Sequence, residues 1–476
     1  MRTIESIPAM DGLDAREAAI IKQLATQYSS YQASNNLRSL YYLGKHSLRA
    51  AGKLGLAVPA QIGKLETILG WPAKAVTTLE HRLNLRGFVT ENGNHDGFAE
   101  IMDDNNFLLE ASMTHTASLI HGTAFVTVSQ GDTQSGEPKA VIAARSAREA
   151  TALWSRRSRK IIAGLTLNPK TDWEDATVSI WLPDRVITAT DTRAGWKLTR
   201  QAHSMGQVPM VMLSFRPHLE EEFGVSRITK TVMGLTDSAM RTMMRMEGTA
   251  EFFSFPQRYA LGVQEEDFAN TFKTYLNRFL ALGRDDNGEL PTMGEFTSSS
   301  PQPHIEQLRV LASMFSGETS IPLNYLGIVQ DNPSSADAIR AAEADLITVA
   351  ERAQRTYGPA WAQVMRMAHA IHAGGWDPGL TRIEPQWRDP ATPTAAATAQ
   401  SVMSLVQAGV LPGKSRVTWE LLGYDEATIL RLEADAAREV AETAFSREEA
   451  ATFAQAAQGL AITTNTWSDD GGVGKP

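Results

Sequence analysis

Residues 226–250 read SRITKTVMGLTDSAMRTMMRMEGTA, and the rest of the chain is organised around this stretch. It predicts one uninterrupted helix with Ser226 as its N-cap, about 38 Å long at 1.5 Å per residue. Five methionines lie within fourteen residues of it, namely Met233, Met240, Met243, Met244 and Met246. Their flexible thioether side chains form an apolar surface that can repack against a neighbour. The stretch is therefore either an ordinary core helix or a helix whose methionines pack against a neighbouring surface.

The chain before this helix changes from a helical to an alternating period. Three helices are predicted in order, over residues 13–47, 71–88 and 96–122, the last ending at Gly122. From 123 to about 215, short runs such as TAFVTVS and ATVSIWL alternate apolar and polar residues between Gly, Pro, Asp and Asn. This pattern is typical of an antiparallel meander. The predicted fold class is α+β, with helices before the sheet.

The chain after this helix predicts a small inserted module and then more helices. Prolines at 256, 291, 301 and 303 prevent one continuous helix over residues 251–302. The predicted order beyond them is a short helix at 304–315, a loop, a long helix from Ser334 or Ser335 to about Ala373, a Pro and Gly-rich linker at 374–394, and an Ala-rich helical domain with a disordered end past Thr463. The chain therefore holds several structural units.

Composition excludes several classes of protein. The chain has 476 residues, a net charge of -9 and no cysteine, so disulfides, zinc ribbons and thiol chemistry are excluded. The N-terminus is charged where a signal peptide needs an apolar core, and no run of about 18 apolar residues occurs, so we expect a protein made in the cytoplasm with no membrane partner. The acidic balance argues against a tight, sequence-independent DNA clamp but not against DNA that slides past.

No motif in the sequence carries recognisable catalytic chemistry. The C-terminal GGVGKP lacks the first glycine and the final Ser or Thr of a phosphate-binding loop. His369 and His372 have helical spacing but no acidic partner at a metalloprotease spacing, so a structural role is favoured over metal binding. The basic run RRSRK at 156–160 either contacts phosphate or forms a solvated hairpin, and the hairpin is favoured. We expect no catalytic residue, no metal site and no cofactor.

Several segments in succession resemble one protein family. They are SSYQASNNLRSLYYLG at 29–44, WPAKAVTTLEHRLNLRGF at 71–88, IMDDNNFLLEASMTHTASLIHGTAFVTV at 101–128, VPMVMLSFRPHLEEEFGVSRI at 208–228 and IPLNYLGIVQDNPSSADAIRAAEADLI at 321–347. They resemble the portal, or head-to-tail connector, proteins of long-tailed double-stranded DNA phages, and most closely those of phages that infect actinobacteria. The likeness covers roughly residues 10–440, and the order of the segments is more specific than any one of them.

The resemblance implies an architecture for each part of the chain. A wing of helices and antiparallel sheet, two stem helices, a small α/β clip and a helical crown are expected. By position these are the wing at 1–225, the first stem helix at 226–250, the clip at 251–302, the second stem helix at 303–320, a channel loop at 321–335, the long wing helix and linker at 336–379, and the crown with its tail at 380–476. Met233, Met240, Met243 and Met244 would then pack the stem helices together.

The resemblance also implies a function and a set of partners. Portal subunits form a cyclic ring, commonly a dodecamer, at one vertex of the capsid, so the expected location is the virion, after assembly in the host cytoplasm. Double-stranded DNA passes through the ring in transit, and Val329, Gln330, Asp331 and Asn332 would lie nearest to it. Expected protein partners are the terminase large subunit, the head completion (adaptor) protein and the major capsid and scaffolding proteins, with the ring nucleating capsid assembly.

Two other functions stay open on the sequence alone. One is a cytoplasmic enzyme whose site is built from dispersed residues. Catalytic turnover after incubation with nucleotides and metals would reveal it. The other is a capsid-associated structural protein without a channel, which images lacking a central hole would reveal.

Overall fold

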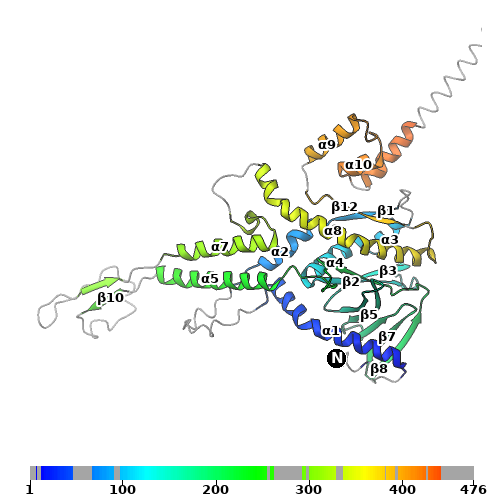
Figure 1. The fold of residues 1–476 in the computed structure, drawn as a ribbon, viewed down its shortest axis with the longest axis horizontal. Coiled ribbons are helices and arrows are strands. Elements are labelled where there is room, and N and C mark those ends of the chain that lie inside the picture. Colours follow the sequence, from blue (N-terminus) through cyan, green and yellow to red (C-terminus); the bar gives the residue numbers. More distant parts are fainter. Residues whose placement is uncertain are drawn as a thin grey trace, which may run out of the picture. The chain divides into compact units, whose positions relative to one another are not determined.

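Figure 1 shows the computed structural model of the chain. It describes residues 7, 12–46, 67–90, 97–193, 195–254, 258–261, 292–295, 300–328, 336–380, 382–391, 395–424 and 427–440. The chain divides into two compact units, Met1–Ala391 and Thr392–Pro476.

The first unit mixes helices with antiparallel strands, as the sequence predicts. Its helices are α1 (Ala15–Tyr42), α2 (Trp71–Glu80), α3 (Phe98–Asp104), α4 (Phe107–His121), α5 (Lys230–Ser254), α7 (Gln302–Thr319), the 3-10 helix η5 (Leu323–Leu326) and α8 (Ala336–Ala373). Its strands are β1 (Leu85–Thr90), β2 (Thr123–Gln130), β3 (Ala140–Ser146), β4 (Ala150–Ser155), β5 (Lys160–Asn168), β6 (Thr177–Trp181), β7 (Arg185–Thr192), β8 (Gly195–Ala202), β9 (Met210–Ser214), β10 (Arg258–Leu261), β11 (Thr292–Glu295) and β12 (Ile383–Trp387).

The predicted meander is divided between two sheets. Strands β4 to β8 follow one another in a five-stranded antiparallel meander, whereas β2 lies between β3 and β9 in a separate three-stranded sheet. β9 therefore returns to the start of the β region, with Phe125 opposite Met212. Helix α1 covers the five-stranded sheet, where Ile21 and Leu24 are buried in one cluster with Leu165.

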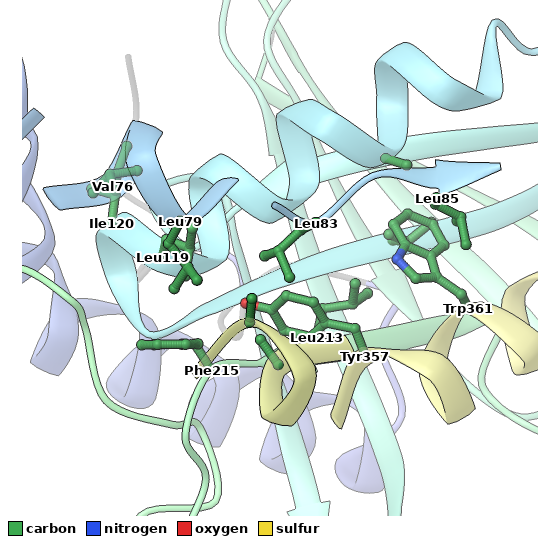
Figure 2. Close-up of a cluster of buried hydrophobic side chains, with 14 of the residues drawn as sticks. Val76, Leu79, Leu83, Leu85, Leu119, Ile120, Leu213, Phe215, Tyr357 and Trp361 are labelled. Carbon is green, nitrogen blue, oxygen red and sulfur yellow. The ribbon is translucent and has the colours of Figure 1, made fainter. Parts of the chain in front are cut away.

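The largest core lies where α2, α4, β9 and α8 meet (Figure 2). Helix α8 contributes Tyr357 and Trp361, which are both fully buried. Each polar atom of these rings is satisfied, because the Tyr357 hydroxyl donates to Ser118 Oγ at 2.9 Å and Trp361 Nε1 donates to His115 Nε2 at 2.9 Å. Buried aromatic rings with satisfied polar atoms hold α8 in one position on α4.

The helix predicted over 71–88 ends early. It stops at Glu80, and residues from Leu85 form β1, which pairs with β12 some 300 residues further along the chain. In the register, Phe88 lies opposite Pro385. The partner strand is too distant in sequence for a local pattern to reveal it.

The helix predicted over 96–122 is two helices, α3 and α4. Asn106 between them adopts a left-handed conformation with φ of 46°. The side chain of Asn105 bonds the edge of β3 instead of extending the helix, since its Nδ2 donates to Ala140 O at 2.9 Å and its Oδ1 accepts from Ile142 N at 2.7 Å. Asparagine competes with helical backbone bonds in this way. The predicted end at Gly122 is confirmed, with φ of 95°.

The expected N-cap of the long methionine helix is wrong. Helix α5 starts at Lys230, because the Ser226 hydroxyl is already engaged with Ile120 O at 2.5 Å and with the backbone NH of Ile228 at 2.9 Å. Thr229 takes the capping role and accepts from Val232 N at 3.1 Å. The expected linker at 374–394 is also partly wrong, since β12 lies within it and belongs to the first unit.

The second unit is helical in its described part, as predicted. It contains α9 (Ala395–Gln407), α10 (Arg416–Leu422) and a helical segment at 427–440. Ser415 caps α10 by accepting from Thr418 N at 3.3 Å. Arg416 joins α10 to the following segment through Glu433 at 3.2 Å. The predicted disorder past Thr463 and the GGVGKP sequence lie outside the described residues.

Candidate functional site

The methionines of α5 occupy different environments. Helices α5 and α7 run side by side (Figure 1). Met240 is 2% exposed, and its Sδ lies 3.2 Å from Nε2 of His46. Met233 packs against the largest core, whereas Met243 and Met244 are half-buried. Met240 is thus held within the subunit, and Met243 and Met244 keep partly exposed side chains further along α5.

A polar cluster that the sequence did not indicate joins the end of α1 to α5. The Tyr41 hydroxyl donates to both carboxylate oxygens of Asp237, at 2.9 and 3.0 Å. The ring of His46 stacks on Tyr41 with centroids 4.0 Å apart and lies 3.7 Å from Asp237. Burial lowers the pKa of His46, and the nearby Asp237 carboxylate opposes that effect. The cluster fixes where α5 leaves the body of the first unit.

Arg227 connects the start of α5 to the end of α7. Its guanidinium donates to the carbonyl oxygens of Ala75 and, at 2.6 Å, of Thr319, the last residue of α7. The side chain is buried, and burial lowers the pKa of Arg227 to about 10. A cation at the C-terminus of α7 satisfies free carbonyls and favours the helix dipole. Arg227 therefore fixes α5 and α7 to α2 at one end.

Two backbone segments approach each other closely at Gly122 and Gly224, and Gly224 lies three residues before Arg227. Gly122 has φ of 95° and Gly224 has φ of 76°. A Cβ atom on Gly224 would lie 2.4 Å from Phe215 O and 2.6 Å from Gly122 O. Backbones this close leave no space for any side chain.

The segment after α7 is anchored at both of its described ends. Ile321 is 1% exposed, and Leu323, Leu326 and Ile328 pack on the largest core. The first half of the expected channel loop is therefore part of the body of the first unit. The residues expected nearest to DNA, namely Val329, Gln330, Asp331 and Asn332, lie outside the described residues.

Tyr325, Arg82 and Glu343 form a hydrogen-bonded network around this segment. The Tyr325 hydroxyl donates to Glu343 Oε1 at 2.5 Å, and Arg82 Nη2 lies 3.1 Å from Glu343 Oε2 and 3.2 Å from the Tyr325 hydroxyl. Arg82 also donates to Pro390 O at 2.5 Å. Burial and the hydrogen bond to Glu343 raise the pKa of Tyr325. Sequence reasoning did not find this network, because Arg82 lies 243 residues before Tyr325 and 261 residues before Glu343.

Candidate metal and phosphate sites are not assembled in the described part of the chain. No group of three or more His, Asp or Glu side chains that could hold a metal ion occurs among the described residues. His369 packs edge-on against Phe98, and His372 lies 3.6 Å from Glu100. The RRSRK run forms the turn between β4 and β5, which is the predicted hairpin. None of the helices in the ranges described above is long and apolar enough to cross a membrane.

Comparison with known proteins identifies the family. The family model described as "Phage portal protein, SPP1 Gp6-like" matches residues 20–441. The chain is 30% identical over 410 residues to the portal protein of Mycobacterium phage D29, covering 81% of this chain and 82% of that protein. It is 29% identical over 429 residues to the portal protein of Mycobacterium phage L5, covering 85% and 86%. The chain belongs to the SPP1 Gp6-like family of phage portal proteins.

A solved structure also resembles the chain. The neck of a native GTA particle, computed with C12 symmetry, gives a TM-score of 0.45 at 11% identity, covering 74% of this chain and 89% of that chain.

Family membership confirms the resemblance that the ordered segments predicted, including the likeness to portals of actinobacterial phages. Phage portal proteins are structural components of the virion and not enzymes. The expectation of a protein without catalytic residues agrees with that family. The domain boundaries, the methionine contacts and the DNA-facing residues stay predictions.

Proposed function

We propose that this chain is one subunit of a closed ring at one capsid vertex, through which the phage genome is packaged and later ejected. The observation that carries the proposal is the family match over residues 20–441, which covers all four sheets of the described residues and their helices from Ile20 in α1 to the second unit. In a cyclic ring each subunit presents two different surfaces to its two neighbours. We expect twelve subunits.

The helix pair supports the stem assignment. Helices α5 and α7 lie side by side, and Arg227 ties the start of one to the end of the other. Residues 251–302 would form the clip that docks the terminase large subunit and later the head completion protein. The antiparallel pair of β10 and β11, with Tyr259 opposite Gly294, is its described part. Residues 1–225 would form the wing, and residues 380–476 would form the crown and its tail.

The residues that line the channel would bind DNA only weakly. A duplex must slide past every subunit, and each phosphate ion pair would have to break at each step. Val329, Gln330, Asp331 and Asn332 carry no positive charge, and the chain as a whole has a net charge of -9. The described residues on either side of this segment are joined, because the Tyr325 hydroxyl donates to Glu343 Oε1 at 2.5 Å.

The remaining partners follow from the place of the ring in the particle. The wing would contact the major capsid and scaffolding proteins, and the ring would nucleate capsid assembly in the host cytoplasm before it becomes part of the virion. Energy for packaging would come from the terminase and not from this chain.

Imaging of the purified full-length protein tests the proposal. We expect electron micrographs of closed rings with a central hole wide enough for a duplex, and a native mass of twelve 52.0 kDa subunits. A stable monomer at high concentration, or a solid oligomer without a hole, would overturn it. The solid oligomer would instead favour a capsid-associated structural protein without a channel.

A further inference from the structure

We propose that the hairpin turns at the two ends of β5 bind each other between neighbouring copies of this chain, the acidic turn of one copy on the basic turn of the next. The inference rests on the proposed ring, and it names one of the contacts that would close it. The basic turn is residues 156–160, and the acidic turn is residues 169–176.

The two turns lie at opposite ends of one sheet. β5 starts at Lys160, the last residue of the basic turn, and ends at Asn168, directly before the acidic turn. Its nine residues span about 30 Å at 3.3 Å per residue. A head-to-tail contact in a ring requires two different surfaces that face in different directions. The two ends of β5 meet that requirement.

The basic turn carries four exposed cations. Arg156, Arg157, Arg159 and Lys160 are all exposed. Arg156 is paired within the subunit, with its Nε 2.5 Å from Glu222 Oε1. Arg157 and Arg159 have no acidic partner among the described residues. Two guanidinium groups are thus available to a neighbouring molecule.

The acidic turn carries a fully presented tryptophan between two carboxylates. Trp173 is 90% exposed, which is unusual for the largest apolar side chain. Asp172 and Glu174 flank it, whereas Asp175 is paired with Lys170 at 3.4 Å. Asp172 and Glu174 have no basic partner among the described residues.

Two hydrogen bonds between Thr171 and Glu174 fix the shape of the acidic turn, and neither uses a carboxylate or the indole ring. Thr171 Oγ1 accepts from the backbone NH of Glu174 at 3.0 Å, and Thr171 N donates to Glu174 O at 3.0 Å. Trp173 is therefore presented at the tip of an ordered turn. Tryptophan is one of the residue types that most often contribute the binding energy of an interface.

The chemistry of the two turns is complementary. An arginine guanidinium stacks on an indole ring through cation–π attraction, for which tryptophan is the best partner. The carboxylates on either side of Trp173 match the guanidinium groups of Arg157 and Arg159, which bind carboxylates with two parallel hydrogen bonds. The cavity beside Arg156 is lined by Glu220, Glu221 and Glu222, so an acidic partner is confined to the tip of the basic turn.

Neighbouring turns do not cancel this difference in charge. Arg148 and Glu149 lie together in the turn between β3 and β4, at the end of the sheet that holds the acidic turn. At the other end, Asp184 and Arg185 pair with each other at 2.9 Å. These two turns add little net charge. Glu222 lies beside the basic turn and Arg193 lies at the acidic end, so the contrast in charge rests on the residues at the two tips that are unpaired among the described residues, namely Arg157, Arg159, Asp172 and Glu174.

Charge reversal of each turn tests the contact. One variant is Arg157→Glu with Lys160→Glu, and the other is Asp172→Lys with Glu174→Lys. Arg159 is left unchanged because it has a left-handed backbone with φ of 50°, and the conformation of the turn should stay the same in every variant. Ring formation is measured by native mass at increasing concentrations of each full-length protein. Each reversed variant alone should need at least about tenfold more protein than the unaltered chain to form rings.

Mixing the two variants gives the sharper result. In a mixture, opposite charges again meet at every junction of an alternating ring, so rings should return at the concentration that the unaltered chain needs. Trp173→Ala should also raise that concentration about tenfold without changing the thermal midpoint of the subunit, because the side chain is exposed.

A matched control keeps the change in charge and moves it elsewhere. Lys197→Glu with Arg352→Glu alters two exposed side chains on β8 and α8 by the same amount. It should leave assembly unchanged. If the unaltered chain forms rings and the reversed variants form them equally well, the contact is wrong while the ring stands. The contact is also wrong if mixing restores nothing, or if the control variant is as impaired as the reversed ones.

Discussion

Tyr325 and Glu343 lie on either side of residues 329–335 along the chain, and the Tyr325 hydroxyl donates a 2.5 Å hydrogen bond to the Glu343 carboxylate. The side chain of Arg82 contacts both residues and is mostly buried. Tyr325 and Glu343 are thus joined to each other and to Arg82, which follows α2.

Removing the Tyr325 hydroxyl should destabilise this junction. Tyr325→Phe is expected to lower the free energy of unfolding by about 2 kcal/mol, since the lost bond was accepted by a charged group. Chemical denaturation measures the change. Tyr31→Phe is the matched control, because Tyr31 is 39% exposed and its hydroxyl has no hydrogen-bond partner among the described residues. Equal losses in both variants would show that the Glu343 bond contributes nothing.

Deleting residues 329–332 should separate assembly from DNA handling. Rings are expected to form normally, because the flanking residues stay anchored through Ile321, Tyr325 and Glu343. DNA-filled heads should be fewer, or should lose their DNA, when the deleted chain replaces the original in a phage infection. Counting filled heads in electron micrographs gives the result, and a normal yield would remove the segment from the mechanism.

Aspartate at Met240 or Met244 should impair ring assembly, but for different reasons. Met240 is buried against His46, so Met240→Asp is expected to cost the subunit itself at least about 3 kcal/mol. Met244 is half-buried, so Met244→Asp should act mainly on contacts between subunits. Thermal melting reports the first effect and native mass the second. Met240→Leu is the control, because it keeps the volume and apolar character and should assemble normally. Unaltered rings with Met244→Asp would contradict this placement of the stem.

The stability of the subunit should fall between pH 7 and pH 5. Burial lowers the pKa of His115 and of His121 to about 3, with Arg38 and Arg148 adding to the effect at His121. In the unfolded chain both histidines gain protons below pH 6.5, whereas in the folded chain they stay neutral. Each therefore costs about 2 kcal/mol of stability by pH 5.

Urea denaturation at the two pH values checks this dependence. His115→Gln keeps an acceptor for Trp361 Nε1. It removes the contribution of one buried histidine, so the stability lost between pH 7 and pH 5 should be smaller by about 2 kcal/mol. His81→Gln changes an exposed histidine and should leave the loss as it was. An identical pH dependence in all three proteins would mean that His115 is not the buried neutral group.

The sequence predicted the parts of the fold that depend on local pattern. The long helix α8, the end of α4 at Gly122 and the alternation in β2 to β9 follow from spacing and capping residues alone. The start of β1 did not, because its partner strand β12 is some 300 residues away. The start of α5 was misplaced because Ser226 uses its hydroxyl on Ile120, a contact made only in the folded chain.

In the candidate site, too, local pattern could be predicted from the sequence and distant contacts could not. Met240 could be marked as a packing residue from its place in a methionine-rich helix, but its partner His46 lies 194 residues earlier. Arg227 gives no sequence signal, because a buried arginine that binds only carbonyl oxygens looks like any surface arginine in a sequence. The same holds for Arg82 and Glu343.

The last prediction concerns the close approach of the backbone at Gly122 and Gly224. Gly224→Ala should abolish soluble folded protein, or lower its stability by more than about 3 kcal/mol, because the added Cβ would lie 2.4 Å from Phe215 O. Gly136→Ala is the matched control: Gly136 has φ of 87°, but a Cβ there meets nothing within 4 Å. That variant carries only the cost of a left-handed conformation, about 1 kcal/mol. Comparing the two melting temperatures separates backbone strain from collision. Equal melting temperatures would mean that the backbone at Phe215 and Gly122 can move away from Gly224. The close approach of these segments would then not fix the start of α5.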